Sequence, residues 1–421
     1  MQGFKNKILI ITNLYPPYVL GGAETYLEKL VQSLSRANYK VGIITARPFF
    51  KGLKYEKTVY ANIYRTYNAN IFFEGNFSNK KSYLKFLWRF FSLVLPVFNL
   101  VQIYLWIKRE KPDVIHTHNL HGFHPLLLVI LKLTKTPIVH TIHDYFFLCP
   151  RLSLLHRDGY ICGQGEQSLN MKEPRTVCLI YRNIFSKLIR DTFTTVTAPS
   201  SFALDIHKTN GLFNESKTIS IPLGTTFETT VSRKNKEYPV SRFNFIYIGA
   251  LSKHKGIHVL IEAVKLTRDI DYSMTIVGDG DLRSDIQDLC KKDSRIEFLG
   301  FVQGKKKTDV FSKSTCMLLP SVWYDNSPVV IYESFSYGIP VIASSIGGIP
   351  ELIKHRSNGL LFTPGSANEL AKAMNELFLD HDLFVELSKN SFRCSDEYSF
   401  EKHVEKISNV YSNVIRVPKH T

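Results

Sequence analysis

The feature that most constrains the fold is an alternation of short apolar segments with longer helical segments, which recurs along the 421 residues. The apolar segments of the first half are rich in β-branched residues: KILIIT (7–12), VGIITA (41–46), DVIHTH (113–118), TPIVHTIH (136–143) and TVTAPS (195–200). Short β-branched strands separated by helices are typical of βαβ units, in which a parallel sheet is covered on both faces. The first half is therefore predicted to be a doubly wound α/β domain.

The second half repeats this plan. Its apolar segments are FNFIYIGAL (243–251), YSMTIVGDG (272–280), RIEFLGF (295–301), CMLLPS (316–321), PVIASS (340–345) and GLLFT (359–363). We therefore predict two Rossmann-like α/β domains, at 1–222 and 223–399, joined near the segment 216–228, after which the chain is polar and loop-like. A last helix, at about 400–421, is a candidate to pack back on the first domain.

The formal net charge of +16 is distributed unevenly. Residues 1–222 hold 28 Lys and Arg against 13 Asp and Glu, whereas the remainder holds 25 against 24. A basic first half suits a phosphate-bearing substrate or an anionic membrane surface. Nucleic acid is a poorer candidate, because no zinc-finger, helix-turn-helix or RNP-like pattern accompanies the charge.

Cysteine usage favours a reducing compartment. Six Cys are spread over the chain and no apolar leader precedes the first strand, which argues against a secreted disulfide scaffold. Cys149, Cys162 and Cys178 lie in one irregular segment with His156, but no C-x-x-C spacing supports a structural zinc there. No metal site is predicted from these residues.

Histidines cluster at the end of two predicted strands in the first half. The members of this cluster are His116, His118, His121, His140 and His143. Their spacing would permit a metal site, but histidines without an accompanying set of carboxylates more often form hydrogen-bonded structural groups. His116 and His118 are expected to share one face of a strand, because side chains alternate between faces.

Ligands of open α/β sheets bind beside the loops that follow the strands, and several such loops are suggestive. Gly21 and Gly22 precede a helix and could approach a phosphate closely. Lys255 in GALSKHKG could meet a diphosphate, or it could be a solvated loop charge. Gly278 and Gly280 of VGDGD could form a tight turn near a ligand. A dinucleotide-dependent oxidoreductase is disfavoured, because no G-x-G-x-x-G opens the first βα unit.

The stretch SVWYDNSPVVIYESFSYGIPVIAS (321–344) predicts a loop, a helix and a buried strand. Ser327 is the expected N-cap, Pro328 fits the first helical position, and Gly338 supplies a left-handed residue that ends the helix. The helix is therefore expected at 328–337.

Two carboxylates in this stretch, Asp325 and Glu333, are separated by seven residues. Asp325 falls in the loop, whereas Glu333 projects from a mostly apolar helix face, where an unpaired carboxylate is costly. Glu333 therefore needs hydrogen-bond donors, and the simpler alternatives are a solvated side chain or a Lys or Arg partner.

Taken together, these motifs resemble the retaining glycosyltransferases of family 4, the group 1 glycosyltransferases. The similarity runs from PPYVLGGAE (16–24) to NGLLFTPGSANELA (358–371). That family carries two Glu separated by seven residues and followed by G-x-P-V-I-A, and Asp325 and Glu333 occupy these positions here. The resemblance implies the GT-B fold, in which two Rossmann-like domains face each other across a cleft.

The resemblance also implies roles for individual residues. Glu333 would bind the ribose diol of a nucleotide-sugar donor, and Asp325 would lie near the donor sugar. Lys255 would bind the diphosphate, and His118 would act beside the donor sugar in catalysis. The remaining positions assigned to donor binding are Gly22, Gly278 and Val329.

Two departures from the family pattern affect this assignment. Asp325 is one methylene shorter than the family Glu, so its contact with the sugar could be shifted or bridged by water. Ala250 stands where many relatives have a diphosphate-binding Arg, and Lys253 is the candidate to replace it.

The implied activity is transfer of a hexosyl group from a nucleoside diphosphate sugar to an acceptor hydroxyl, with retained anomeric configuration and without cofactor or metal. No pair of flanking carboxylates suits a covalent intermediate, so departure and attack on one face are expected. Surface polysaccharide or glycolipid synthesis of the bacterial type is the expected pathway. The alternatives are a GT-B phosphorylase, a nucleotide-sugar epimerase and a catalytically silent nucleotide-sugar-binding protein.

An uncharged run at 90–107 lies between basic residues. Pro96, Asn99 and Gln102 interrupt it, which argues against a membrane-spanning helix. A buried domain helix is the favoured interpretation, and a membrane-facing surface is the alternative. The second interpretation predicts a peripheral enzyme at the cytoplasmic face of a membrane, with a lipid-linked or glycan acceptor. Its flanking cations are Lys80, Lys81, Lys85, Arg89, Lys108, Arg109 and Lys111.

Overall fold

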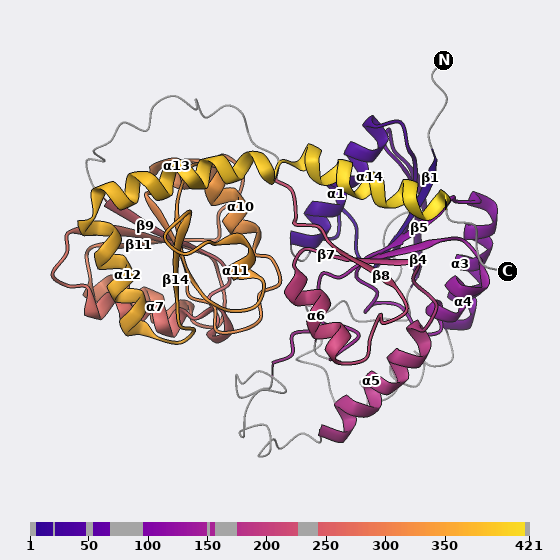
Figure 1. Ribbon diagram of the computed structural model, residues 1–421, viewed down its shortest axis with the longest axis horizontal. Helices are drawn as coiled ribbons and strands as arrows, with labels where there is room; N and C mark the ends of the chain where they lie inside the picture. The colour runs from indigo at the N-terminus through magenta and orange to yellow at the C-terminus, as the bar shows by residue number, and fades with distance from the viewer. Residues whose placement is uncertain are drawn as a thin grey trace. The chain divides into compact units, whose positions relative to one another are not determined.

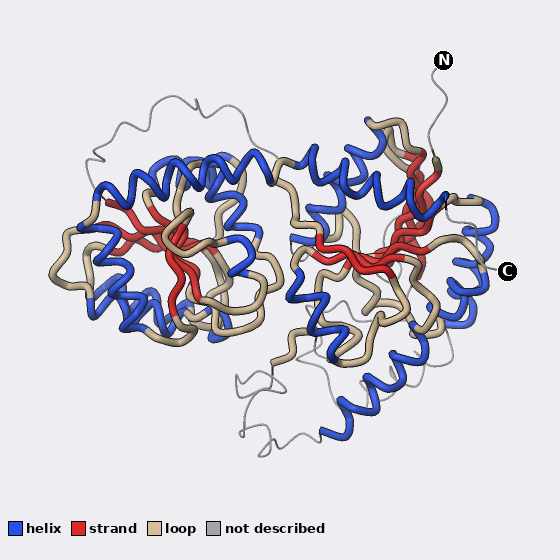
Figure 2. Tube along the Cα trace, in the orientation of Figure 1, coloured by secondary structure: helices blue, strands red, loops and turns tan. Residues whose placement is uncertain are grey.

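The computed structural model describes residues 6–19, 22–47, 54–67, 96–149, 152–155, 175–225 and 243–416. These residues form two compact units. The first unit holds the described residues up to Leu154, those from 175 to Ile221 and those from Val404 onward, and the second holds Leu155 and Pro222–His403. Each unit is built around one sheet, drawn in red in Figure 2.

The sheet of the first unit has eight strands in the order β3-β4-β2-β1-β5-β6-β7-β8. Its neighbours pair in parallel, except that β3 is antiparallel to β4. The strands are β1 (Lys7–Thr12), β2 (Lys40–Arg47), β3 (Tyr55–Lys57), β4 (Asn62–Tyr67), β5 (Val114–Thr117), β6 (Ile138–Thr141), β7 (Thr195–Ala198) and β8 (Lys217–Ser220).

The direction in which the chain winds along this sheet reverses after β4. From β1 the chain moves outward to β2, β4 and the edge strand β3, whereas from β5, on the other side of β1, it moves step by step to β8. Because crossovers between parallel strands are right-handed, this reversal places α1 on one face and α3 to α6 on the other. Figure 1 shows α4, α5 and α6 on the opposite side of the sheet from α1. The helices are α1 (Gly22–Arg36), α3 (Pro96–Glu110), α4 (Leu127–Leu133), α5 (Arg175–Ile189) and α6 (Ser201–Thr209).

The second unit has a six-stranded sheet in the order β11-β10-β9-β12-β13-β14, with all pairs parallel. Alternate residues of β9 enter two separate apolar cores: Phe245 and Tyr247 pack on one face, and Ile246 and Ile248 on the other. This two-faced burial confirms the predicted doubly wound fold. The strands are β9 (Phe243–Ile248), β10 (Tyr272–Val277), β11 (Ile296–Gly300), β12 (Cys316–Leu319), β13 (Val341–Ser344) and β14 (Gly359–Phe362).

Helices cover both faces of this second sheet. They are α7 (Ile257–Leu266), α8 (Arg283–Lys292), α9 (Lys305–Lys313), α10 (Val329–Ser336), α11 (Ile349–Leu352), α12 (Ala367–Leu379) and α13 (His381–Glu397), with a 3-10 turn η3 (Lys253–Lys255) before α7. A last helix, α14 (Phe400–Arg416), begins in the second unit, and from Val404 onward it belongs to the first.

The predicted helix 328–337 is one residue too long at each end, because α10 spans Val329–Ser336 between the caps Pro328 and Tyr337, whereas the predicted role of Gly338 is confirmed. Pro328 has an extended ψ of 117°, so it occupies the N-cap and makes no side-chain capping bond. Ser327, the expected cap, instead has its hydroxyl oxygen 2.6 Å from the Tyr332 hydroxyl. At the other end Gly338 has φ 63°, and its N–H donates to the Phe335 carbonyl, as a left-handed terminating glycine should.

The uncharged run predicted at 90–107 coincides with α3 from residue 96 onward, and Pro96 begins that helix rather than interrupting it. Residues 90–95 and the four preceding cations lie outside the described residues, as do His156 and Cys162. In the part of the chain that the structure describes, no helix is long and apolar enough to cross a membrane. The same residues hold no group of three or more potential metal ligands.

We expect Gly256→Ala to destabilise the second unit strongly. Gly256 has φ 74°, and a Cβ there would lie 1.7 Å from the Pro320 carbonyl oxygen. The left-handed conformation alone costs about 1–2 kcal/mol for a non-glycine residue, and the overlap adds to that cost. Gly365→Ala is the control, because Gly365 has φ 84° with nothing within 4 Å of its added Cβ. Calorimetric unfolding should show a clearly larger loss for Gly256→Ala, and equal losses would contradict the close approach.

Candidate functional site

Loops of the second unit meet at the carboxyl ends of its strands with their backbones in contact. A Cβ on Gly278, after β10, would lie 1.8 Å from the Gly249 carbonyl oxygen. A Cβ on Gly347, after β13, would lie 2.4 Å from the carbonyl oxygen of Asp325. Only glycine permits such approaches, so these loops pack tightly against one another at the carboxyl ends of the strands. Gly278 has φ 148°, and the turn of this loop follows at Gly280, whose carbonyl accepts from the Arg283 N–H at 3.1 Å.

Asp325 lies among these packed loops and is held by several hydrogen bonds. Its side chain is 7% exposed, and its two oxygens accept from Lys255 Nζ and from the Ser321 hydroxyl, each at 2.5 Å. Its carbonyl also accepts from the Gly348 N–H at 2.8 Å. A carboxylate buried in this way needs both a cation and hydrogen bonds, and both are supplied.

Lys255 is therefore part of a partly buried ion pair in this structure. Its side chain is 21% exposed, and Nζ lies 5.2 Å from the centre of the Trp323 ring. An anionic ligand that reached Lys255 would share the ammonium with Asp325 or displace that carboxylate. Lys253, the candidate to replace the missing Arg, is exposed in η3, two residues before Lys255.

Glu333 also has a cation. Lys307 Nζ donates to both carboxylate oxygens, at 2.6 and 2.9 Å, and the two side chains are 30% and 25% exposed. Sequence reasoning missed Lys307, which lies in the first turn of α9. The only signal was the run Lys305–Lys306–Lys307, and periodicity could not show which of the three faces α10. A ribose diol would have to share the Glu333 carboxylate with Lys307.

The other predicted donor-site residues lie at element boundaries. Val329 is the first residue of α10 and is 41% exposed. In the first unit, Gly22 is the first residue of α1 and is exposed, whereas Gly21 lies outside the described residues.

His118 follows β5 in the first unit and is fully buried. Its backbone N–H donates to the Ile11 carbonyl at 2.9 Å, and its ring Nδ1 lies 2.9 Å from His143 Nε2. Tyr26 of α1 packs against both rings, with ring centroids 6.3 and 5.5 Å away. A sugar could touch His118 only after some neighbouring group moved aside.

His116 lies next to His118, and the two ring centroids are 4.0 Å apart. Its Nδ1 lies 2.7 Å from the hydroxyl of Tyr411, and its Nε2 lies 2.7 Å from Thr141 Oγ1. Each ring nitrogen of His116 thus lies within hydrogen-bond distance of a hydroxyl, and the two contacts together fix the orientation of the buried ring. Sequence reasoning missed Tyr411, which is 295 residues away on α14.

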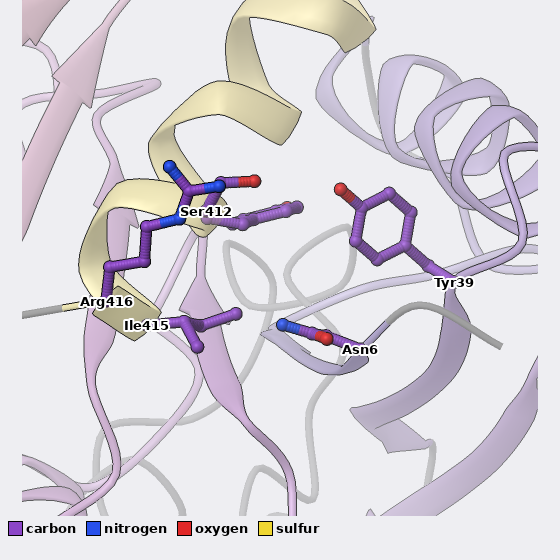
Figure 3. A pocket seen from close by; sticks show the side chains of 6 residues that line it. Asn6, Tyr39, Ser412, Ile415 and Arg416 are labelled. Carbon is purple, nitrogen blue, oxygen red and sulfur yellow. The ribbon is translucent and has the colours of Figure 1, made fainter.

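Tyr411 also lines a pocket of about 250 Å³ in the first unit. Figure 3 shows Tyr39, Asn6, Ser412, Ile415 and Arg416 around it. No residue assigned to the donor site lines this pocket, so it is separate from the residues predicted to act in catalysis.

Several histidines of the first unit are held neutral by burial. Burial lowers the pKa of His143 to about 4, against the opposing effect of Asp144. Burial likewise lowers the pKa of His207 to about 4 and that of His140 well below its usual value. At neutral pH the His118–His143 contact is therefore a hydrogen bond to an uncharged His143 ring.

Two family models match the chain. The model described as Glycosyltransferase Family 4 matches residues 20–228, and the one described as Glycosyl transferases group 1 matches residues 228–393. The chain belongs to this family of glycosyltransferases. The predicted family is thereby confirmed, and the likeness to solved glycosyltransferase structures confirms the predicted GT-B fold.

Individual relatives agree with the family assignment. An uncharacterized glycosyltransferase of Methanocaldococcus jannaschii is 24% identical over 96% of this chain and 97% of its own. A UDP-Gal:alpha-D-GlcNAc-diphosphoundecaprenol alpha-1,3-galactosyltransferase of Escherichia coli is 25% identical over 78% of this chain and 82% of its own. The solved sucrose-phosphate synthase of Thermosynechococcus elongatus matches with a TM-score of 0.72 and 19% identity, over 97% of this chain and 99% of that one.

The buried histidines predict how the glycosyltransferase responds to acid. His207 has a folded pKa of about 4, below the ordinary value of 6.5, so the unfolded chain binds more protons between these pH values. Stability is therefore complete above pH 6.5 and falls as the pH drops toward 4, by about 1.4 kcal/mol per pH unit for each such group.

We expect His207→Leu to make the decline of the unfolding temperature between pH 7 and pH 5 shallower, whatever its effect at pH 7. His381→Leu is the control, because His381 is exposed at the start of α13. Calorimetry across this range would measure both slopes. A His207→Leu slope equal to that of the unmodified protein would show that buried His207 does not cause the loss of stability in acid.

Proposed function

We propose that this glycosyltransferase moves a hexosyl group from a nucleoside diphosphate sugar to an acceptor hydroxyl with retained anomeric configuration. The observation that carries the proposal is the pair of lysine–carboxylate contacts, Lys255–Asp325 and Lys307–Glu333, on and before α10. Each places a cation and an acid together, beside backbones that can approach a ligand closely. This combination suits a ligand that presents both an anionic diphosphate and sugar hydroxyls.

In the proposed complex, Glu333 accepts from the ribose hydroxyls and Lys255 contacts the diphosphate. The diphosphate gains charge as the glycosyl bond breaks, so a cation held in place by Asp325 stabilises the transition state more than the ground state. Asp325, released from part of its contact with Lys255, faces the donor sugar. Gly22, Gly278 and Val329 complete the proposed donor site.

His118 is proposed to contact the donor sugar directly. Its complete burial means that donor binding must open a path to the ring, while the bond to His143 holds the ring in place. Departure of the diphosphate and attack by the acceptor on the same face need no protein-bound metal in this scheme.

The proposed acceptor is a lipid-linked sugar or a surface glycan, and the proposed location is the cytoplasmic face of a membrane. Support comes from the excess of cations in residues 1–222 and from the Escherichia coli relative, whose name specifies a diphosphoundecaprenol-linked acceptor. The proposed pathway is therefore surface polysaccharide or glycolipid synthesis, with no part for nucleic acid.

We expect one nucleoside diphosphate hexose to stabilise the protein in a thermal-shift panel of UDP-, GDP- and ADP-sugars, because a ligand of the folded state raises the unfolding temperature. Glu333→Ala should weaken that donor by roughly 10- to 100-fold, since a charged hydrogen bond to the ribose contributes about 1.5–3 kcal/mol. Glu262→Ala is the matched control, because Glu262 forms a 2.6 Å pair with Lys265 on the exposed side of α7. Unchanged donor affinity in Glu333→Ala would sink the ribose assignment.

His118→Ala and Lys255→Ala should separate sugar contact from diphosphate contact. His118→Ala should lower turnover while nucleotide affinity changes little, whereas Lys255→Ala should lower both. Lys265→Ala controls for the loss of an exposed lysine of the second unit. Steady-state kinetics with the stabilising donor measures these effects, and product analysis distinguishes transfer from phosphorolysis, epimerisation or binding alone. Unmodified turnover in His118→Ala would count decisively against its role.

A further inference from the structure

Exposed apolar side chains of the first unit concentrate on three helices. Of the sixteen large hydrophobic side chains that are exposed among the described residues, eight lie on α3, α4 and α5 or at the N-cap of α4. They are Val101, Leu105, Leu126, Val129, Leu133, Leu179, Ile180 and Ile184, with exposed fractions from 40% to 62%. Scattered surface apolar residues are ordinary, but a concentration of this kind marks an interaction surface.

The three helices form one continuous layer. Right-handed crossovers place them on the same face of the sheet, and α4 contacts both α3 and α5. Lys132 at the end of α4 donates to the Arg190 carbonyl just after α5, at 3.1 Å. Figure 1 shows α3 and α4 next to each other on this side of the unit.

Within each helix the exposed apolar residues form a stripe opposite the buried side. On α3 the residues Leu100, Ile103 and Ile107 are buried, whereas Val101 and Leu105 are 51% and 59% exposed, one turn apart. The helix is therefore apolar on both sides. The uncharged run therefore fits both interpretations given for it, a buried helix and a membrane-facing surface. One side of α3 enters the domain core, and the other side remains on the surface.

Cations surround these stripes and acids are scarce. The exposed cations on the three helices or within two residues of their ends are Lys108, Arg109, Lys111, Lys132, Lys135, Lys187 and Arg190. Glu110 at the end of α3 is buried and paired with Lys7, so it does not offset this charge on the surface. Asp191, 3.9 Å from Lys132, is an exposed acid beside them.

We propose that the outer face of α3, α4 and α5, called here the docking face, binds an anionic lipid bilayer. Apolar side chains flanked by Lys and Arg are the pattern of a surface that enters the boundary between headgroups and acyl chains. Anionic headgroups complement the cations within a Debye length of the membrane. A second copy of this chain would instead bring cations against cations, which disfavours a symmetric dimer through this face.

The proposal deepens the proposed function, on which it rests for its biological purpose, by assigning the membrane contact to particular side chains. It adds that membrane binding needs both the cations and the apolar stripes. The cations attract the first unit to the bilayer, and the apolar stripes hold it there when salt weakens that attraction.

Co-sedimentation of the full chain with vesicles tests the proposal. We expect binding to phosphatidylcholine vesicles that contain phosphatidylglycerol, little binding to phosphatidylcholine alone, and weaker binding as salt rises. Replacing Leu105, Leu133 and Ile184 by Ser should reduce the bound fraction at moderate salt at least tenfold. Replacing Arg109, Lys135 and Lys187 by Gln should reduce binding at low salt by a similar factor.

Matched controls come from the second unit. Leu266, Phe301 and Leu379 are exposed there to a similar or greater extent, and their replacement by Ser should leave vesicle binding unchanged. Lys292, Lys313 and Lys389 are exposed as well, and their replacement by Gln serves the same purpose for charge. Controls that lose binding as much as the docking-face variants would overturn the proposal.

Two further results would overturn it. One is recovery of the unmodified protein in the supernatant with anionic vesicles at low salt. The other is a concentration-dependent dimer that the three Ser substitutions on the docking face abolish, because the occupant would then be a second copy.

The donor thermal-shift panel, run without lipid, keeps this proposal separate from the proposed function. Vesicle binding without donor stabilisation would leave the docking face standing and the proposed function refuted. Donor stabilisation without vesicle binding would have the opposite meaning.

Discussion

Both units depend on one constraint: a parallel sheet must be covered by helices on both faces. The chain meets this constraint by changing the side on which it adds strands, after β4 in the first unit and after β11 in the second. At each such point two neighbouring strands send their following loops to opposite faces, which leaves an opening at the carboxyl ends of the strands. The residues assigned to donor binding in the second unit and His118 in the first follow strands near these openings. The places of these candidate residues at the strand ends of each unit are thus a consequence of how the sheets are covered.

The charged residues of the second unit show how a site can be kept folded before a ligand arrives. A buried carboxylate without a partner would destabilise the protein, and Lys255 and Ser321 remove that cost for Asp325. In the proposed donor complex, the same contacts would make ligand binding an exchange of partners rather than an addition of new ones. Affinity for the donor would then depend on the difference between two sets of hydrogen bonds, and not on the sum of those made to the ligand.

Local sequence patterns predicted most of the fold. Apolar β-branched segments identified strands β1, β2, β5, β6 and β7 and all six strands of the second unit, and Gly338 correctly ended α10. They missed β3, β4 and β8, because these strands lie near the edge of the sheet and are less apolar. The N-cap of α10 was wrong by one residue, because Pro328 adopts an extended conformation that no local rule required.

The candidate site was predictable as a set of residues but not as a set of contacts. The motif spacing pointed to Asp325 and Glu333, whereas their lysine partners are 70 and 26 residues away in the chain. Periodicity carries no information about such pairs. The burial of His118 was equally inaccessible, since it depends on α1 and on a neighbouring strand. Tyr411 is the extreme case, because it completes a histidine network from the other end of the sequence.

That position of Tyr411 has a consequence for biosynthesis. The second unit is drawn almost entirely from one continuous segment, Pro222–His403, so all of that segment is available once the ribosome has passed it. The core of the first unit includes residues of α14 from Val404 onward, although most of the unit is synthesised before the second unit begins. During translation the first sheet therefore lacks the contact between His116 and Tyr411 until the last helix has been synthesised. Domains usually complete folding in the order of their synthesis, whereas here the first unit can complete its core only after every residue of the second has been synthesised.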